Sequence, residues 1–368
     1  MANFQNCAWG HCHNSLCNNA KTVCAYALSP SIAPMTLQTK ADTVLKPTSA
    51  KPVRIGTRGS ILALAQASEL RARLMAAHDL DENCFSIDVI STAGDRIQNR
   101  ALNELGGKGL FTEEIEDRLL SDDLDIAVHS SKDMPTVLPD GLELSTILPR
   151  EDPTDAFLSH KAKRLEDLPH GAVVGSASLR RQAMIKRLRP DLQLVNLRGN
   201  VDTRIRKLGK GIVDATLLAT AGLNRTGLSE HITSRLPVET FLPAVGQGAV
   251  CVEVCCRRTD IKDFLAPIHH RETGLCLWAE RAFLRELDGS CRTPIAAFAS
   301  IEDDIMSFRG MVLSTDGQTA FGTSRTLAAP DAASVTALGR EAGQTIRDEA
   351  GEDFLANIIH NQHILETR

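Results

Sequence analysis

The chain has 368 residues, of which 43% are hydrophobic, and a formal net charge of -5 at pH 7. This length is enough for two or three domains with cores of their own. The acidic balance excludes a global attraction to nucleic acid or to an anionic membrane, so any basic site must be local. No stretch holds the roughly 18 consecutive apolar residues that a membrane span needs.

Residues 1–50 are predicted to be an extension outside the folded domains. They hold two histidines, one acid, no arginine and four cysteines, Cys7, Cys12, Cys17 and Cys24. The cysteine spacing fits no common zinc pattern, so we expect no metal site. The composition is typical of a disordered tail or of an imperfect transit peptide, and an over-extended reading frame that truly starts at Met35 is a third interpretation.

The first thirty residues lack the basic start and apolar run of a secretory signal. We therefore expect a cytoplasmic protein with free thiols, or one of an organellar matrix or stroma if the extension is a transit peptide. Cys251, Cys255, Cys256 and Cys276 are expected to be small core residues.

Residues 51–149, joined by 247–268, are expected to form a first α/β domain. "VRIG" is strand-like, and after the loop "TRGS" apolar residues recur at helical spacing from Leu64 to Leu74, with Ser60 as N-cap. "FSIDV" alternates as a strand, "GGKG" is a flexible loop, and a helix follows around Ile115. "DIAVHS" is a buried strand that leads into the loop "SKDMP". Such alternation indicates a mainly parallel sheet.

Residues 150–246 repeat this plan as a second α/β domain. The strand-like segments "AVVGS", "LQLVNL" and "DATLLA" are each followed by a helical pattern. "LPAVGQGAV" then returns the chain to the first domain, which gives two chain crossings and two lobes like those of periplasmic binding proteins. A cleft between such lobes can open and close on a ligand.

Residues 269–368 are predicted to form a small α+β domain. A helix from about 272 to 287 precedes three alternating segments, "PIAAFAS", "IMSFRGMVL" and "TAFGTSRTL", and a last helix runs from about 332 to 349. The segments predict a three-stranded antiparallel sheet. Cys291 lies in "GSCRTPIA", on a loop between the helix and an edge of this sheet; taken alone, it is an unremarkable loop thiol.

Positive charges follow the predicted strands of both lobes: Arg58, Lys132, Arg180, Arg181, Arg198 and Arg204. A cation in the first turn of a helix opposes the helix dipole at a cost of roughly 0.3–1 kcal/mol, so another interaction must offset it. One such residue would be a solvated surface charge, but six at the same topological position indicate a common site. Helix N-termini and guanidinium groups both bind anions, and strand ends converge in open α/β sheets. The sequence thus predicts a ligand with several negative charges.

Asp133, in "HSSKDMP", stands among these cations. It is either a structural partner of Lys132 or a turn-forming residue, or else a carboxylate that faces a cationic reaction centre. "GGKG" around Lys108 lacks the spacing of a nucleotide-binding loop, and we interpret it as a mobile lid.

Eight segments appear in the order found in one enzyme family: "IGTRGSILALAQA", "GGKGLFTEEIE", "DIAVHSSKDMP", "REDPTDAF", "GSASLRRQ", "LRGNVDTR", "LPAVGQGAV" and "GSCRTPIA". From Val53 onward the sequence resembles the porphobilinogen deaminase (hydroxymethylbilane synthase) family of tetrapyrrole biosynthesis. These transferases join four porphobilinogen molecules head to tail, release ammonia each time, and then hydrolyse the product, hydroxymethylbilane, from a covalent dipyrromethane cofactor.

The resemblance implies roles for individual residues. Cys291 would carry the dipyrromethane cofactor through a thioether, since a thiolate captures electrophiles readily. Asp133 would be the catalytic aspartate, holding pyrrole N–H groups and stabilising the azafulvene cation left when ammonia departs. The residues implied to bind cofactor or substrate carboxylates are Arg58, Ser60, Lys108, Lys132, Ser178, Arg180, Arg181, Arg198, Arg204 and Arg225.

The resemblance also implies a monomer that binds porphobilinogen, without a nucleic-acid or membrane partner. Glu104 stands where the family has lysine, so no binding role is carried over to it, and "DGSC" replaces the family's "GGC".

Two other functions fit parts of the pattern. A non-enzymatic two-lobed anion-binding protein would need an export signal and neither Cys291 nor Asp133. RNA binding through "SLRRQ" and "LRGN" would need stacking aromatics, which make up only 4% of the chain.

Overall fold

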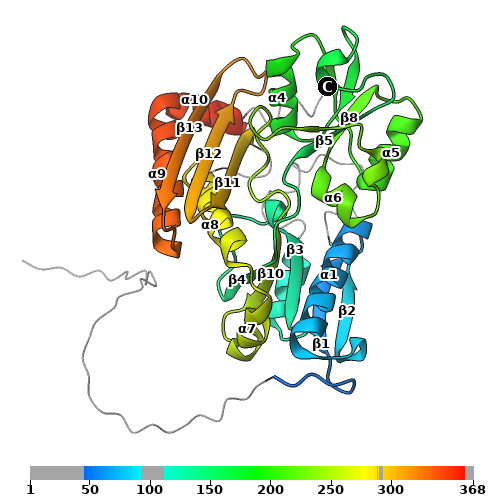
Figure 1. Ribbon diagram of the computed structural model, residues 1–368, viewed down its shortest axis with the longest axis vertical. Helices are drawn as coiled ribbons and strands as arrows, with labels where there is room; N and C mark the ends of the chain where they lie inside the picture. The colour runs from blue at the N-terminus through cyan, green and yellow to red at the C-terminus, as the bar shows by residue number, and fades with distance from the viewer. Residues whose placement is uncertain (1–44, 93–111, 288, 290–292, 361–368) are drawn as a thin grey trace, which may run out of the picture. The chain divides into compact units, whose positions relative to one another are not determined.

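The structure is a computed structural model that describes residues 45–92, 112–287, 289 and 293–360. All of these belong to one compact unit, Thr43–Arg368. They form three β-sheets, two of five strands and one of three, with helices packed against them (Figure 1). Short 3-10 helices also occur: η1 (Glu82–Cys84), η3 (Ser131–Asp133), η4 (Leu165–Asp167), η5 (Ser229–His231) and η6 (Ala266–Ile268).

The first sheet has the strand order β2-β1-β3-β10-β4. Its strands are β1 (Val53–Arg58), β2 (Phe85–Ile90), β3 (Ile126–Ser130), β4 (Leu142–Ile147) and β10 (Val250–Cys255). The helices of this part are α1 (Ile61–His78), α3 (Glu113–Leu120) and α7 (Thr259–Leu265). Ile55, Leu70 and Val252 are fully buried where α1 covers the sheet, as the helical spacing of the sequence predicts.

The second sheet has the strand order β7-β6-β8-β5-β9. Its strands are β5 (Asp155–Ser159), β6 (Val173–Gly175), β7 (Gln193–Val195), β8 (Ala215–Ala219) and β9 (Ser234–Leu236). Three helices follow its parallel strands: α4 (Leu179–Leu188), α5 (Val201–Gly209) and α6 (Thr220–Arg225). The chain enters this sheet after β4 and returns to the first sheet as β10, which confirms the predicted double crossing.

The sheets are mainly parallel, as predicted, but both are mixed, because one strand of each runs against the other four. β10 runs antiparallel to both β3 and β4, and β5 runs antiparallel to both β8 and β9. These two strands directly follow the crossings between the sheets, so they enter from the opposite end. Parallel pairing is kept between β1 and its neighbours β2 and β3, and between β6 and its neighbours β7 and β8.

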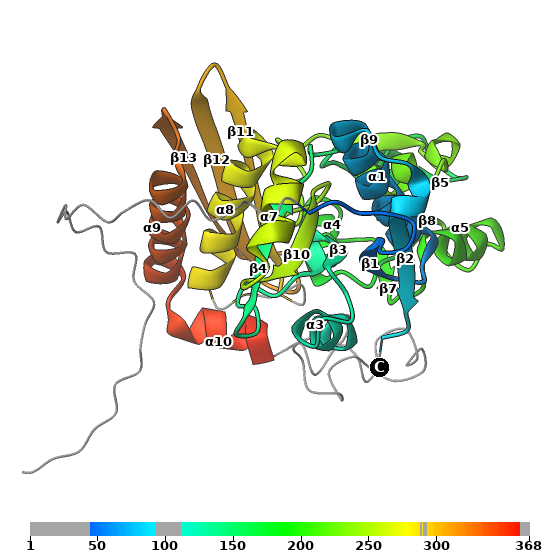
Figure 2. The same cartoon turned by 90° about the horizontal axis from the view of Figure 1, so that it is seen from below.

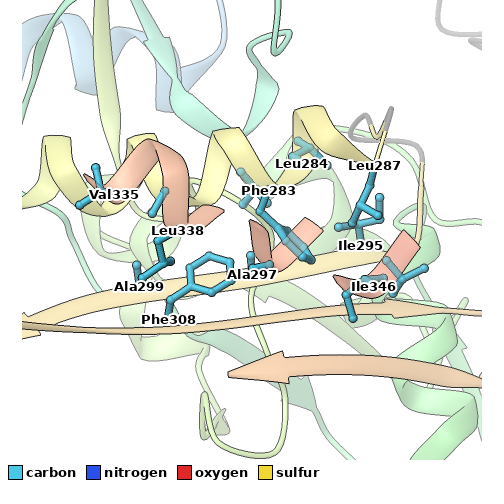
Figure 3. Packing of buried hydrophobic residues seen from close by; sticks show 14 of the residues in the cluster. Phe283, Leu284, Leu287, Ile295, Ala297, Ala299, Phe308, Val335, Leu338 and Ile346 are labelled. Atoms are coloured by element: carbon cyan, nitrogen blue, oxygen red, sulfur yellow. The ribbon is translucent and has the colours of Figure 1, made fainter. Parts of the chain in front are cut away.

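The third sheet is antiparallel in the order β11-β12-β13, as predicted. Its strands are β11 (Ile295–Glu302), β12 (Ile305–Leu313) and β13 (Ala320–Ala328), and its helices are α8 (Arg271–Glu286), α9 (Ala332–Ala350) and α10 (Glu352–His360). Helices α8 and α9 lie side by side on one face of the sheet (Figure 2). Between them and the strands, Phe283 packs edge-on against Phe308 with ring centroids 5.4 Å apart (Figure 3). Helix α10 was not predicted.

One buried carboxylate joins the third sheet to both chain crossings. Glu280, on α8, has no exposed surface and accepts hydrogen bonds from both terminal guanidinium nitrogens of Arg150, at 2.6 and 3.2 Å. It also accepts the backbone N–H groups of Gly246 at 2.7 Å and Ala299 at 2.9 Å. Arg150 precedes β5 and Gly246 precedes β10, so this carboxylate holds the crossings against β11.

The described cysteines follow the prediction with one exception. Cys251, Cys255 and Cys276 are buried, but Cys256 is exposed because it lies just past the end of β10, where the chain turns to solvent. Among the described helices, none is long and apolar enough to span a bilayer.

Candidate functional site

The end of β3 supplies two of the predicted site residues. Strand β3 continues into η3, which contains Lys132 and Asp133. The turn is fixed by the N–H of Ser131, which donates to Ala249 O at 3.0 Å, and by Arg281 of α8, whose Nη2 donates to Pro135 O at 2.6 Å. The side chain of Asp133 is exposed, so this fixed backbone presents an accessible carboxylate.

Lys132 lies in a positively charged environment. The side chain is half-buried, and loss of solvation lowers its pKa to about 8. Asp133 opposes this change, while the nearby positive charges of Arg181 and Arg204 add to it. The structure therefore brings together a carboxylate and three predicted cations from both sheets.

The predicted pair Arg180 and Arg181 is buried around one carboxylate of the second sheet. Both lie in the first turn of α4, where the N-cap Ser178 accepts the N–H of Arg181 at 3.4 Å. Arg180 Nη2 donates to Asp155 Oδ2 at 2.8 Å, and Arg181 donates to Asp155 Oδ1 through Nε at 2.9 Å and Nη2 at 2.6 Å. Burial alone would raise the pKa of Asp155, but the two guanidinium groups outweigh it and lower the pKa to about 2. Two positive charges thus share one negative charge.

Arg198 and Arg204 lie at the start of α5. The turn between them contains Gly199, whose φ of 124° is unfavourable for any residue with a side chain. Arg204 Nε donates to Gly199 O at 2.7 Å. Burial and the charges of Arg181 and Arg198 lower the pKa of Arg204 to about 10, against the opposing charge of Asp133.

Arg58 and Ser60 lie where β1 passes into α1. Arg58 is the last residue of the strand, and Ser60 is the N-cap, as predicted, because its hydroxyl accepts the N–H of Ala63 at 3.2 Å. Leu62, in the first turn of α1, lines a pocket.

This pocket is lined by residues of both sheets and of the chain crossing between them, among them Leu62, Gln66, Ser130, Lys132, Arg225 and Gly246. Arg225, at the end of α6, donates from Nε to Glu69 Oε2 at 2.9 Å and from Nη1 to Gly248 O at 3.0 Å. Lys132 and Arg225 therefore line the same pocket.

Two glutamines near the site were not predicted. Gln66 is buried and donates to Ser130 Oγ at 2.8 Å, while Gln247 donates from Nε2 to Asp155 Oδ1 at 3.1 Å. The signal for Gln66 was present: it is a polar residue on the helix face that also carries Leu70 and Leu74, and such a residue needs a partner. No comparable pattern in the sequence marks Gln247.

The charges that the structure gathers suit a ligand with several carboxylates. Around Asp133 and Asp155 stand four cations that influence one another's ionisation: Lys132, Arg180, Arg181 and Arg204. A surplus of buried positive charge is costly unless an anion offsets it, and a dipyrrole with acetate and propionate groups supplies such anions. Lys108, Cys291 and Glu104 lie outside the described residues.

Comparisons with known proteins give a family. Residues 53–263 match the model "Porphobilinogen deaminase, dipyromethane cofactor binding domain", and residues 274–348 match "Porphobilinogen deaminase, C-terminal domain". A porphobilinogen deaminase of Nitrobacter hamburgensis is 54% identical over 302 residues, which are 82% of this chain and 94% of that protein.

Solved structures that resemble the chain include the methionine-binding protein MetQ, at 14% identity and a TM-score of 0.38 over 60% of this chain and 91% of that one. The VFT2 domain of BvgS from Bordetella pertussis is 17% identical, with a TM-score of 0.34 over 59% of this chain and 86% of that one. Since the first family model alone matches more than half of the chain, the chain belongs to the porphobilinogen deaminase family.

Proposed function

We propose that Asp133 is the catalytic carboxylate of the family's reaction, in which porphobilinogen molecules are joined head to tail with loss of ammonia. The observation that carries this proposal is an exposed carboxylate on a fixed turn, beside Lys132 and Arg204. In that position it can accept a pyrrole N–H and stabilise the positive charge that develops on the substrate as ammonia departs.

The cations around Asp133 bind the acetate and propionate groups of the substrate and of the growing chain. Direct binding suits Lys132, Arg204 and Arg225, which lie around the pocket or within the influence of Asp133. Arg180 and Arg181 are buried and donate to Asp155 and to the backbone oxygens of Leu242 and Leu217, so in our proposal they contribute mainly positive potential. Arg58, Ser60, Lys108, Ser178 and Arg198 complete the proposed set.

Cys291 is the proposed attachment point of the dipyrromethane cofactor, through a thioether. When bound, the cofactor supplies the primer to which the pyrrole units are added. The surplus of positive charge around Lys132 and Arg204 fits its carboxylates. We further propose a monomer located in the cytoplasm, or in an organelle if residues 1–50 act as a transit peptide.

We also propose the division into a first domain of residues 51–149 and 247–268, a second of 150–246 and a third of 269–368. The sheet order supports it, since β5 to β9 form one sheet and β11 to β13 another.

Replacing Asp133 by asparagine tests the catalytic role. Asp133→Asn keeps the size of the side chain and removes its charge, so we expect kcat to fall at least 100-fold with unchanged folding, the lower end of what a general acid–base contributes. Product is measured as porphyrin absorbance after acidification and oxidation. Asp140→Asn, on the loop before β4, removes an exposed aspartate from the same segment and should leave kcat unchanged. If Asp133→Asn turned over within threefold of the original protein, Asp133 would not be the catalytic group.

A further inference from the structure

The carboxylate of Glu69 is bound to the guanidinium group of Arg225, which the proposed function assigns to a carboxylate of the ligand. Its Oε2 accepts Arg225 Nε at 2.9 Å, and Arg225 lines the pocket together with Gln66, Ser130 and Lys132. Glu69 belongs to α1 of the first sheet and Arg225 to α6 of the second, so the pair also links the two sheets.

The two partners differ in how much they depend on each other. The side chain of Arg225 is 9% exposed, whereas that of Glu69 is 26% exposed. A buried guanidinium needs an anionic partner at all times, because leaving a buried charge unpaired is strongly unfavourable. Glu69 has access to water and a second partner one turn further along α1: Arg73 donates to Glu69 Oε1 through Nε at 3.2 Å and Nη2 at 3.0 Å.

A carboxylate of the ligand can therefore replace Glu69 at Arg225 without leaving the charge of Arg225 or that of Glu69 unpaired. Arg225 would exchange one carboxylate for another, and Glu69 would keep Arg73 and its water. Gly248 O, which accepts Arg225 Nη1 at 3.0 Å, keeps the guanidinium in place during the exchange. Within the described residues Arg225 Nη2 has no hydrogen-bond acceptor, so one edge of the group is left for the arriving anion.

We propose that Glu69 is a resident competitor for Arg225, which weakens the binding of substrate and product carboxylates and is displaced when they bind. This rests on the proposed function, which gives Arg225 its ligand. A cleft crowded with cations would hold a polyanionic product tightly, and an internal carboxylate that regains Arg225 favours its release.

The test uses the full chain carrying its covalent cofactor and compares KM and kcat for porphobilinogen. Glu69→Gln removes the competing charge, and we expect KM to fall about tenfold, equivalent to about 1.4 kcal/mol, without a rise in kcat. Arg73→Gln removes the second partner of Glu69 and should raise KM, because Glu69 then depends more on Arg225. The control is Glu82→Gln. Glu82 is an exposed carboxylate whose Oε1 lies 2.7 Å from Nη1 of Arg71, another arginine of α1, and its replacement should not change KM.

A double-mutant cycle shows whether Glu69 acts through Arg225. In an Arg225→Gln background, Glu69→Gln should no longer lower KM. An unchanged or higher KM in the single variant, or a tenfold fall that persists without Arg225, would overturn the proposal.

A binding measurement separates this proposal from the proposed function. Succinate, a dicarboxylate, should raise the thermal unfolding midpoint more for Glu69→Gln than for the original protein, and equal shifts would count against the competition. If the original protein formed no product from porphobilinogen, the proposed function would fail, whatever the succinate shifts.

Discussion

Replacing Asp155 by asparagine should destabilise the second sheet severely. Asp155 has no exposed surface and accepts three hydrogen bonds from Arg180 and Arg181, at 2.6–2.9 Å, and a fourth from Gln247 at 3.1 Å. In Asp155→Asn the NH2 group of the amide faces one of the N–H groups that donated to the carboxylate, so two hydrogen-bond donors oppose each other. The substitution also removes the negative charge that balances two buried guanidinium groups. Breaking a buried ion pair by removing one partner costs about 3–5 kcal/mol.

This loss is large against the roughly 5–15 kcal/mol by which domains are stable. At about 4–8 °C per kcal/mol for a domain of this size, the unfolding midpoint of the second domain should fall by about 12–40 °C. The measurement is thermal and urea unfolding followed by circular dichroism. The control is Asp191→Asn. Asp191 also pairs with an arginine, Arg189, at 2.7 Å, but both of these side chains keep access to water. It should lose much less stability.

The pH dependence gives the same argument a second test. The folded-state pKa of Asp155 is lowered from 3.8 to about 2, so its contribution to stability is complete above about pH 4 and is lost as the pH falls toward 2. The shift corresponds to about 2 kcal/mol. Asp155→Asn should flatten the stability curve in this window. A loss below about 1 kcal/mol at pH 7, with an unchanged acid limb, would refute the view that this carboxylate neutralises the pair.

Two further predictions concern the site. The pKa of Lys132 is lowered to about 8, so its positive charge is lost as the pH rises through 8, and kcat/KM should fall over the same range. In Lys132→Arg this fall should move to higher pH. A pH profile identical to that of the original protein would exclude Lys132 as the cause of the fall. Cys291→Ser should lack the mass of a covalent dipyrrole on intact mass spectrometry, while Cys256→Ser, at an exposed thiol, should keep it; a retained mass in the first variant would place the cofactor elsewhere.

Local patterns in the sequence predicted much of the fold. The apolar spacing located α1, α8 and α9 to within a few residues, and alternation located the three strands of the last sheet. Strand direction was not predictable in this way, because β10 pairs with β3 across more than 100 residues and its orientation depends on the route of the chain between the sheets. Helix α10 was missed since the predicted helix ended just before Gly351, and the chain resumes a new helix directly after it.

For the site, position was predictable and pairing was not. Placing Lys132 and Asp133 at the end of a strand follows from the buried run "DIAVHS", and the structure puts both on η3. That Asp155 would occupy Arg180 and Arg181 could not be read from the sequence, since it depends on β5 lying beside β8 under α4. Assigning these arginines to a ligand therefore stays a prediction.

Asp155 and Glu69 together show how burial decides which internal carboxylate a ligand can displace. Asp155 is held by two arginines and has no access to water. If a ligand took its arginines, the carboxylate would remain buried and unpaired, which is strongly unfavourable, so Asp155 is a permanent partner of the two arginines. Glu69 is 26% exposed and has Arg73 as a second partner, so it can leave Arg225 at little cost. The chain as a whole carries a net charge of -5. Among the described residues, Asp155 and Glu69 pair directly with arginines of the site. A fixed carboxylate leaves those cations with a surplus of charge, and an exchangeable one moderates how tightly that surplus holds a polyanion.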